Sequence, residues 1–245
     1  MPLNRRRDPK FFATTRWSLV LAAGEQRPSV EAREALAALC EAYWYPLYGF
    51  LRGRGHSPAD AEDLTQAFFA TLLEKQVLSR ADPSKGRFRS FLLKCLQNFS
   101  ANVTAKNRAS KRGGDVRTIS LDFAVGEDRL CREPTSDETP ERTFDRRWAL
   151  TLLDGAMSQL RTEAQEAAKD EQFETLAPYL TGDDSARTYA ETATILGLSE
   201  GAVKVAVHRL RRRFRDVVRH EILQTVSSPV EIDDELRHLL AAVQK

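Results

Sequence analysis

Apolar residues recur every three or four positions along most of this chain, the spacing that gathers side chains on one face of an α-helix. No run of alternating apolar and polar residues is long enough to indicate a β-sheet. The first clear apolar stripe consists of Leu36, Leu39, Cys40, Tyr43, Leu47, Phe50 and Leu51. Pro46 falls inside this stripe and is expected to bend or interrupt the helix. The pattern predicts an all-α fold.

Two further helices are expected after this stripe. Ser57 and Pro58 form a start signal, because a hydroxyl suits the N-cap and proline suits the first helical position. The helix that begins there turns Ala61, Leu64, Phe68 and Leu72 inward and leaves Asp60, Glu62, Asp63 and Gln66 on its other faces. After a loop at residues 82–86, the next helix turns inward Phe88, Leu92, Cys95, Leu96, Phe99 and Val103.

A chain of 245 residues is long enough for two small domains. Residues 127–145 are acidic and polar, with Pro134 and Pro140 among them, and indicate a flexible acidic linker. A second domain follows, whose first stripe is Trp148, Leu152, Leu153, Ala156, Met157 and Leu160. A short final helix is expected after Pro229, with the stripe Ile232, Leu236, Leu239 and Leu240. The predicted boundaries are 1–27 for an N-terminal extension, 28–114 and 146–223 for two helical domains, 115–145 for the linker and 224–245 for a C-terminal extension.

The formal net charge is only +2, but the basic residues are segregated along the chain. No acid occurs between Lys85 and Gly114, a segment that contains Lys85, Arg87, Arg89, Lys94, Lys106, Arg108, Lys111 and Arg112. A second basic block covers residues 204–219, where only Asp216 opposes the positive charge. Two separated basic surfaces are typical of a protein that contacts a polyanion twice, or of two solvated helix faces.

Cysteine and histidine positions predict no metal and no cofactor. Cys40, Cys95 and Cys131 are far apart and form no Cys-x-x-Cys pair, so free thiols are expected. The histidines lack the spacing of metal ligands. The N-terminal arginines at 5–7 superficially resemble an export signal, but Arg16 interrupts the apolar stretch after them and what remains is too short to span a bilayer. The expectation is a cytoplasmic protein without membrane insertion.

The most specific pattern lies in residues 189–204 and predicts a helix-turn-helix, the alternative being a helical hairpin that only packs in a bundle. Ala193 is small enough for two helices to approach closely, Gly197 permits the turn, and Val203 fills the shared core. Ser199 is placed to cap the second helix. In that helix Val203, Val207, Leu210 and Phe214 face inward, so Lys204, His208, Arg211 and Arg212 project outward.

This segment resembles the C-terminal promoter-binding domain of extracytoplasmic-function (ECF) RNA polymerase sigma factors, above all in Ser199-Glu200-Gly201-Ala202-Val203-Lys204 followed by His208-Arg209. Upstream, residues 60–66 resemble the family's polymerase-binding helix. Residues 86–93, with Asn98, resemble its promoter-melting helix. The likeness covers roughly residues 35–221, and the added ends are similar to extensions in a subgroup of the family.

The resemblance implies a non-enzymatic protein that directs bacterial core RNA polymerase to promoters and assists promoter melting. Its implied polymerase-binding residues, which dock on the clamp helices, are Asp60, Glu62, Asp63 and Gln66. Those implied for the melted promoter element are Lys85, Arg87, Arg89, Phe91, Lys94 and Asn98, although Phe88 beside them is expected in the core. Those implied for the upstream duplex are Ser199, Glu200, Gly201, Lys204, His208, Arg209, Arg211 and Arg212, with Arg213 as a further phosphate contact. The polymerase flap and an anti-sigma factor are further implied partners.

Two other functions are open at this stage. A stand-alone helix-turn-helix regulator accounts for the C-terminal half alone, and the sequence contains no dedicated heptad dimerisation helix. A metal-dependent nuclease using Asp60, Glu62 and Asp63 is disfavoured, because Asp60 and Glu62 point about 200° apart on a helix and do not readily share one ion. The two extensions are expected to cap a domain or to bind a regulator.

Overall fold

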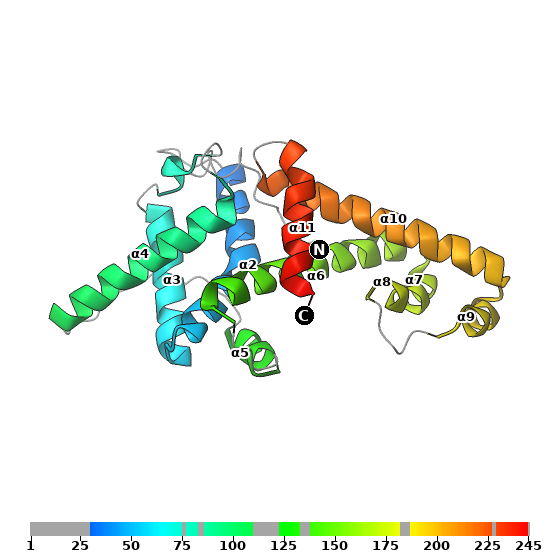
Figure 1. Ribbon diagram of the computed structural model, residues 1–245, viewed down its shortest axis with the longest axis horizontal. Coiled ribbons are helices and arrows are strands. Elements are labelled where there is room, and N and C mark those ends of the chain that lie inside the picture. The colour runs from blue at the N-terminus through cyan, green and yellow to red at the C-terminus, as the bar shows by residue number, and fades with distance from the viewer. Residues whose placement is uncertain are drawn as a thin grey trace, which may run out of the picture. The chain divides into compact units, whose positions relative to one another are not determined.

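The computed structural model describes residues 30–74, 77–82, 86–109, 123–132, 138–181, 187–226 and 229–244, and Figure 1 shows its helices. The described residues contain no strand, so the predicted all-α fold is confirmed there. In chain order the elements are α2 (Val30–Gly53), α3 (Pro58–Glu74), the 3-10 turn η1 (Val77–Arg80), α4 (Phe88–Ala109), α5 (Phe123–Arg132), α6 (Pro140–Glu166), α7 (Asp170–Leu176), α8 (Pro178–Thr181), α9 (Tyr189–Leu196), α10 (Glu200–Thr225), the 3-10 turn η3 (Pro229–Glu231) and α11 (Ile232–Val243).

The chain divides into two compact units. The first contains residues 1–151 and 222–245, and the second contains residues 152–221. The division therefore falls within α6 and within α10, whereas the sequence pattern placed it at residues 146 and 223. The last helix, α11, belongs to the first unit. The predicted N-terminal extension lies outside the described residues.

The core of the first unit is built from the faces that the sequence pattern selects. On α2, Tyr43, Leu47 and Leu51 are at most 1% exposed, and α2 packs along α3 (Figure 1). The Phe88 ring of α4 meets the Tyr43 ring edge-on at 5.7 Å. Pro46 does not interrupt α2, which runs through it from Val30 to Gly53.

A helix occupies part of the predicted linker. In α5, Phe123 is buried, and its ring lies 5.3 Å from that of Trp44 and 5.4 Å from that of Tyr48 on α2. Gly126 lies under the same indole, so close that a Cβ at residue 126 would come within 2.6 Å of the Trp44 ring. Residues 123–132 are therefore a packed part of the first unit, because the aromatic contacts outweigh the polar character of the segment.

The buried face of α11 differs from the predicted stripe at one position. Ile232 and Leu239 are buried as expected, but Leu240 is 51% exposed. The third buried residue of this helix is Glu235, which is 1% exposed. An acid occupies this position because two arginines of the same unit meet it there.

The second unit is a small bundle around α10. Its core cluster consists of Leu176, Ala193, Val203 and Val207, with Tyr179, Tyr189, Leu196, Ala206 and Leu210 packed against it. Three of the residues predicted to face inward on α10, Val203, Val207 and Leu210, thus meet the small Ala193 of α9 in one core, while Phe214 is half-buried outside this cluster.

Cys40, Cys95 and Cys131 are free thiols. Across the described ranges no helix has the length and apolar character needed to cross a membrane. In the same ranges, no group of three or more His, Cys, Asp or Glu side chains is placed to hold a metal ion.

Candidate nucleic-acid interface

The turn between α9 and α10 is set by local signals in the sequence. Thr188 and Glu191 form a capping box at the start of α9, with each side chain bonded to the other residue's backbone N–H. Gly197 ends α9 in the left-handed conformation, at φ 63° and ψ 30°, which glycine adopts at little cost. The Ser199 hydroxyl then accepts a hydrogen bond of 3.2 Å from the N–H of Ala202. The second helix therefore begins where the sequence predicts.

A pair of stacked tyrosines packs next to the segment that leads into α9. The rings of Tyr179 and Tyr189 stack in parallel, with centroids 5.2 Å apart. The Tyr179 hydroxyl donates to the Arg187 carbonyl at 2.6 Å and lies 2.7 Å from the hydroxyl of the buried Thr192. These contacts hold the segment before α9 against α8, and so help to fix the orientation of the helix pair.

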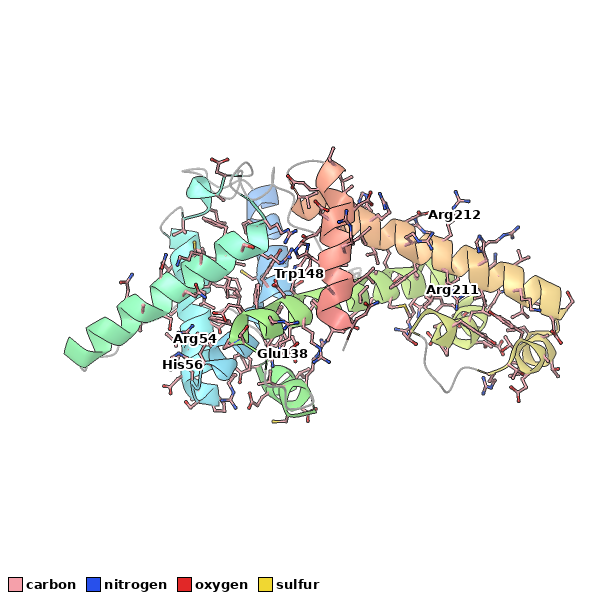
Figure 2. All side chains as sticks on the ribbon, viewed as in Figure 1. Arg54, His56, Glu138, Trp148, Arg211 and Arg212 are labelled. Carbon is pink, nitrogen blue, oxygen red and sulfur yellow. The ribbon has the colours of Figure 1, made fainter. Side chains whose placement is uncertain are left out.

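The outward face of α10 is the basic surface predicted for duplex DNA. Each of its predicted contact residues is exposed, namely Ser199, Glu200, Gly201, Lys204, His208, Arg209, Arg211 and Arg212. Arg211 also donates to the Tyr179 carbonyl, at 3.0 Å from Nη2, and Lys204 lies 5.6 Å from the centre of the Tyr189 ring. Figure 2 labels Arg211 and Arg212 on α10. Within the described residues, no acid pairs with Arg209 or Arg212.

Arg213, in contrast, is already engaged. Its Nη2 and Nε donate to the Glu163 carboxylate of α6 at 2.5 and 2.9 Å. The hydrogen bonds from Arg213 hold the pKa of Glu163 below its ordinary value, so the carboxylate is charged at neutral pH. Arg213 is therefore less available to a polyanion than Arg209 and Arg212, which are exposed and pair with no acid among the described residues.

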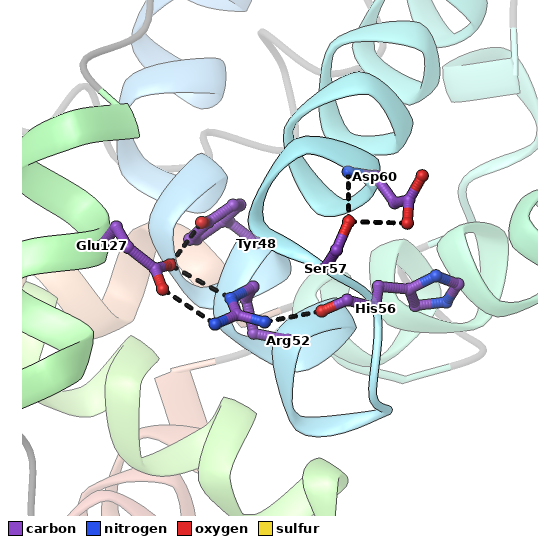
Figure 3. Close-up of polar contacts among 6 residues, drawn as sticks. All are labelled: Tyr48, Arg52, His56, Ser57, Asp60 and Glu127. Atoms are coloured by element: carbon purple, nitrogen blue, oxygen red, sulfur yellow. Dashed lines mark hydrogen bonds and ion pairs between the residues drawn. The ribbon is translucent and has the colours of Figure 1, made fainter.

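The acidic start of α3 is a second candidate surface. The Ser57 hydroxyl accepts from the Asp60 N–H at 3.1 Å and donates to the Asp60 carboxylate at 2.6 Å, as Figure 3 shows. Glu62 accepts a hydrogen bond of 3.2 Å from the Gln66 amide one turn later. Asp60 and Asp63 are exposed, while Glu62 and Gln66 are half-buried. Asp60 thus has a capping role in addition to the implied polymerase contact.

A long-range cluster that sequence reasoning missed holds this corner together. Glu127 of α5 binds the Arg52 guanidinium in a paired arrangement at 2.8 and 3.1 Å and also accepts from the Tyr48 hydroxyl at 2.5 Å (Figure 3). The same guanidinium donates to the His56 carbonyl at 2.6 Å, in the turn before α3. The hydrogen bonds from Arg52 and, less strongly, from Tyr48 lower the pKa of Glu127. One acid therefore ties α5 to the end of α2.

Helix α4 presents part of the predicted surface for the melted element. Phe88 is fully buried, so its predicted place in the core is confirmed. Lys94 and Asn98 are exposed, and Phe91 is half-buried with its ring 6.0 Å from that of Phe88. Lys85 lies outside the described residues.

Two predicted contact residues at and just before the start of α4 are held by other helices, Arg89 being buried and Arg87 half-buried. Arg89 is only 5% exposed, with its Nε 2.9 Å from the Asp145 carboxylate and its guanidinium 4.4 Å from the centre of the Trp148 ring. Glu235 of α11 pairs with Arg89 and, at 2.5 Å, with Arg87. Burial lowers the pKa of Arg89, and the Asp145 carboxylate opposes that shift.

Residues 39–109 match the protein family Sigma-70 region 2. The match supports a sigma-70 family factor. Sigma-70 region 2 binds core RNA polymerase and promoter DNA, so the domain indicates a role in polymerase binding and promoter melting. Sigma factors are in general not enzymes. No curated protein and no solved structure gives a match to this chain.

The region 2 match begins within α2 and ends with α4. It therefore contains the exposed acids of α3 and the described basic residues of α4, the two surfaces predicted on this side of the chain. The residues that cover Arg87 and Arg89 lie outside region 2, on α6 and α11. Sequence reasoning missed these partners, and the one available signal was a glutamate in phase with Ile232 and Leu239.

Proposed function

We propose that this protein is an ECF-type sigma factor that directs bacterial core RNA polymerase to specific promoters. Region 2 grips the polymerase and the opened strand, while the second unit binds the upstream duplex. Catalysis belongs to the polymerase. The observation that carries the proposal is the region 2 match, because it spans both α3 and α4.

The polymerase contact is assigned to the polar face at the start of α3, which consists of Asp60, Glu62, Asp63 and Gln66. Asp63 is its clearest member, since it is exposed and does not share the capping role of Asp60. The expected partner is the pair of clamp helices in the largest polymerase subunit, with the flap as a second contact for the second unit.

The melted promoter strand is assigned to α4. Arg87, Arg89 and Lys94 supply cations for phosphates, and Phe91 and Asn98 supply contacts to unpaired bases, with Lys85 as a further cation. A cation with an adjacent aromatic ring is a combination suited to single strands.

The upstream duplex is assigned to α10. Its N-terminal residues Ser199, Glu200 and Gly201 are exposed where a recognition helix meets base edges. Lys204, His208, Arg209, Arg211 and Arg212 follow along the outer face and suit the phosphate backbone. Ala202 and Val205 stand where the family resemblance leads one to expect polar residues, so base contacts are fewer and phosphate contacts dominate.

The remaining parts of the proposal concern regulation and place. A sigma factor works where polymerase and chromosome are, so we propose residence in the cytoplasm. An anti-sigma factor is a further proposed partner. A stand-alone helix-turn-helix regulator is the alternative, and the region 2 match does not favour it.

The test is binding of the purified chain to bacterial core polymerase, with Asp63→Arg as the variant. Reversing this exposed charge is expected to weaken binding by at least about tenfold, in the range of a lost interfacial charge contact. Glu41→Arg is the matched control, because Glu41 is an exposed acid of the same domain outside α3. Equal binding by all three proteins would contradict the assignment of α3, and no binding by the natural chain would favour the stand-alone regulator.

A further inference from the structure

The acid that meets Arg87 and Arg89 is almost completely buried. Glu235 is 1% exposed, its Oε2 lies 2.5 Å from the Nε of Arg87, and its Oε1 pairs with Nη1 of Arg89. His238, one turn later on α11, has its Nδ1 3.0 Å from Nη2 of Arg87. One helix face thus meets both arginines that the proposed function assigns to the melted strand, and Asp145 of α6 holds Arg89 as well.

Stability alone does not explain an acid at this position. A buried ion pair contributes little net stability, because desolvation of the two charges offsets their attraction, and apolar residues of similar size often serve as well. Ile232 and Leu239 on the same face show that the helix buries apolar side chains there. A carboxylate can, however, take the place of a phosphate on an arginine, because both anions accept a pair of N–H donors from the guanidinium.

The packing around the pair is incomplete. A cavity of about 150 Å³ lies beside it, lined among others by Arg89, Trp148 and His238. Figure 2 shows Trp148 and Glu138 of this region beside α11. On α11 itself, Leu240 is 51% exposed, and the preceding turn leaves Val230 86% exposed. The closed position of α11 therefore depends on charges that have an alternative ligand as well as on the buried Ile232 and Leu239.

We propose that α11 is a reversible cover, which holds Arg87 and Arg89 through Glu235 until promoter DNA displaces it. The proposal rests on the proposed function, since it takes these arginines to be nucleic-acid contacts. The nucleic-acid phosphate and the Glu235 carboxylate compete for the same guanidinium groups. Opening of α11 and binding of the strand are therefore coupled, so that each favours the other.

Fluorescence anisotropy at low salt measures the binding of a labelled single-stranded DNA of mixed sequence to four proteins, namely the natural chain and three variants. Glu235→Gln removes the charge from the cover, and a chain ending at Ser228 removes the cover itself. Asp234→Asn is the matched control, because it removes the same charge from the same helix at a position where the acid is exposed and pairs with the exposed Arg237. Binding by the Glu235→Gln and shortened chains is expected to tighten by about fivefold or more over the control, the lower bound of a typical coupling.

A second pair of substitutions assigns the gain to the covered residues. In the shortened chain, Arg87→Gln with Arg89→Gln is expected to return the affinity to that of the full chain. Equal affinity of the Glu235→Gln and Asp234→Asn chains would overturn the proposal and leave α11 as a fixed part of the domain. If the shortened chain loses helicity, the comparison of these two full-length variants still decides.

The outcome is distinguishable from a failure of the proposed function. If the Glu235→Gln and shortened chains show no gain in single-strand affinity, while the protein still binds core polymerase and starts transcription, only the proposal that α11 is a cover is overturned. A gain in a chain that does not bind polymerase overturns the sigma-factor proposal, and the covered arginines then belong to another single-strand binder.

Discussion

Glu163 on α6 holds the guanidinium of Arg213 on α10 through two hydrogen bonds, of 2.5 and 2.9 Å, in the middle of the basic block that faces outward from the second unit. The acid therefore removes one cation from the surface that is proposed to meet duplex DNA. Arg209 and Arg212, which precede Arg213 on α10, remain exposed.

Glu163→Gln is expected to release Arg213 for a phosphate contact. The slope of log affinity against log salt concentration for duplex DNA then steepens by about 0.9, the value for one added phosphate contact. The loss of stability is small, at about 0 to 1 kcal/mol, because both side chains are more than a third exposed. Glu174→Gln is the control, since it breaks the Arg161 pair of the same unit without touching α10. Equal slopes for the two variants would contradict the account.

Gly197→Ala is expected to destabilise the second unit through the backbone alone. The residue has φ 63°, and no atom lies within 4 Å of the position that a Cβ would take. The substitution is expected to lower the free energy of unfolding by about 1 to 2 kcal/mol, because an L-residue with a Cβ is strained in the left-handed conformation. Urea unfolding measures this change. Gly201→Ala is the matched control on α10, where the added methyl group meets only the Ser199 hydroxyl at 3.9 Å and is expected to leave stability equal or raise it. A neutral Gly197→Ala would mean that the turn is formed differently.

The Glu127 cluster predicts a specific pH dependence. The hydrogen bonds from Arg52 and Tyr48 hold the pKa of Glu127 below its ordinary value of 4.5. A group with a lowered pKa in the folded state stabilises the fold above its unfolded pKa, and this contribution is lost as the pH falls through the folded pKa. Glu127→Gln is expected to cost about 1 kcal/mol at neutral pH, and the unfolding free energies of the two proteins converge well below pH 4.5. A constant difference across that range would contradict the cluster.

The cysteines report on the packing of α2. Burial raises the pKa of the Cys40 thiol to about 12, and the side chain is 3% exposed. Cys131 on α5 is exposed. A thiol reagent at neutral pH is therefore expected to label Cys131 first and Cys40 only after the protein unfolds, as read by mass spectrometry. Early labelling of Cys40 in a Cys131→Ser chain would show that α2 is not packed as described.

Local signals explain why the helix pair of the second unit was predictable. Gly197, Ser199 and Val203 each act on their own neighbours in sequence, so the spacing alone locates the turn and the core position. The inward placement of Phe88 followed in the same way from its helical phase.

Contacts between distant residues were not predictable from the same patterns. Glu127 and Arg52 are 75 residues apart, and Glu163 and Arg213 are 50 apart, so neither pair leaves a periodic trace. The polar composition of residues 127–145 favoured a linker, whereas Phe123 and Gly126 fit α5 against the rings of α2. Leu240 was expected to be buried because the apolar pattern of α11 was read on the assumption that acids lie on the exposed face. Glu235 is an exception to that assumption, because it pairs with two arginines in the interior.

In vitro transcription with bacterial core polymerase, this protein and a library of upstream DNA fragments from the source organism tests the assignment as a sigma factor. Discrete start sites that core polymerase alone does not give are expected, and they are expected to be lost with the Asp63→Arg chain but not with the Glu41→Arg chain. No added start site, together with no binding to core polymerase, would contradict the assignment as a sigma factor.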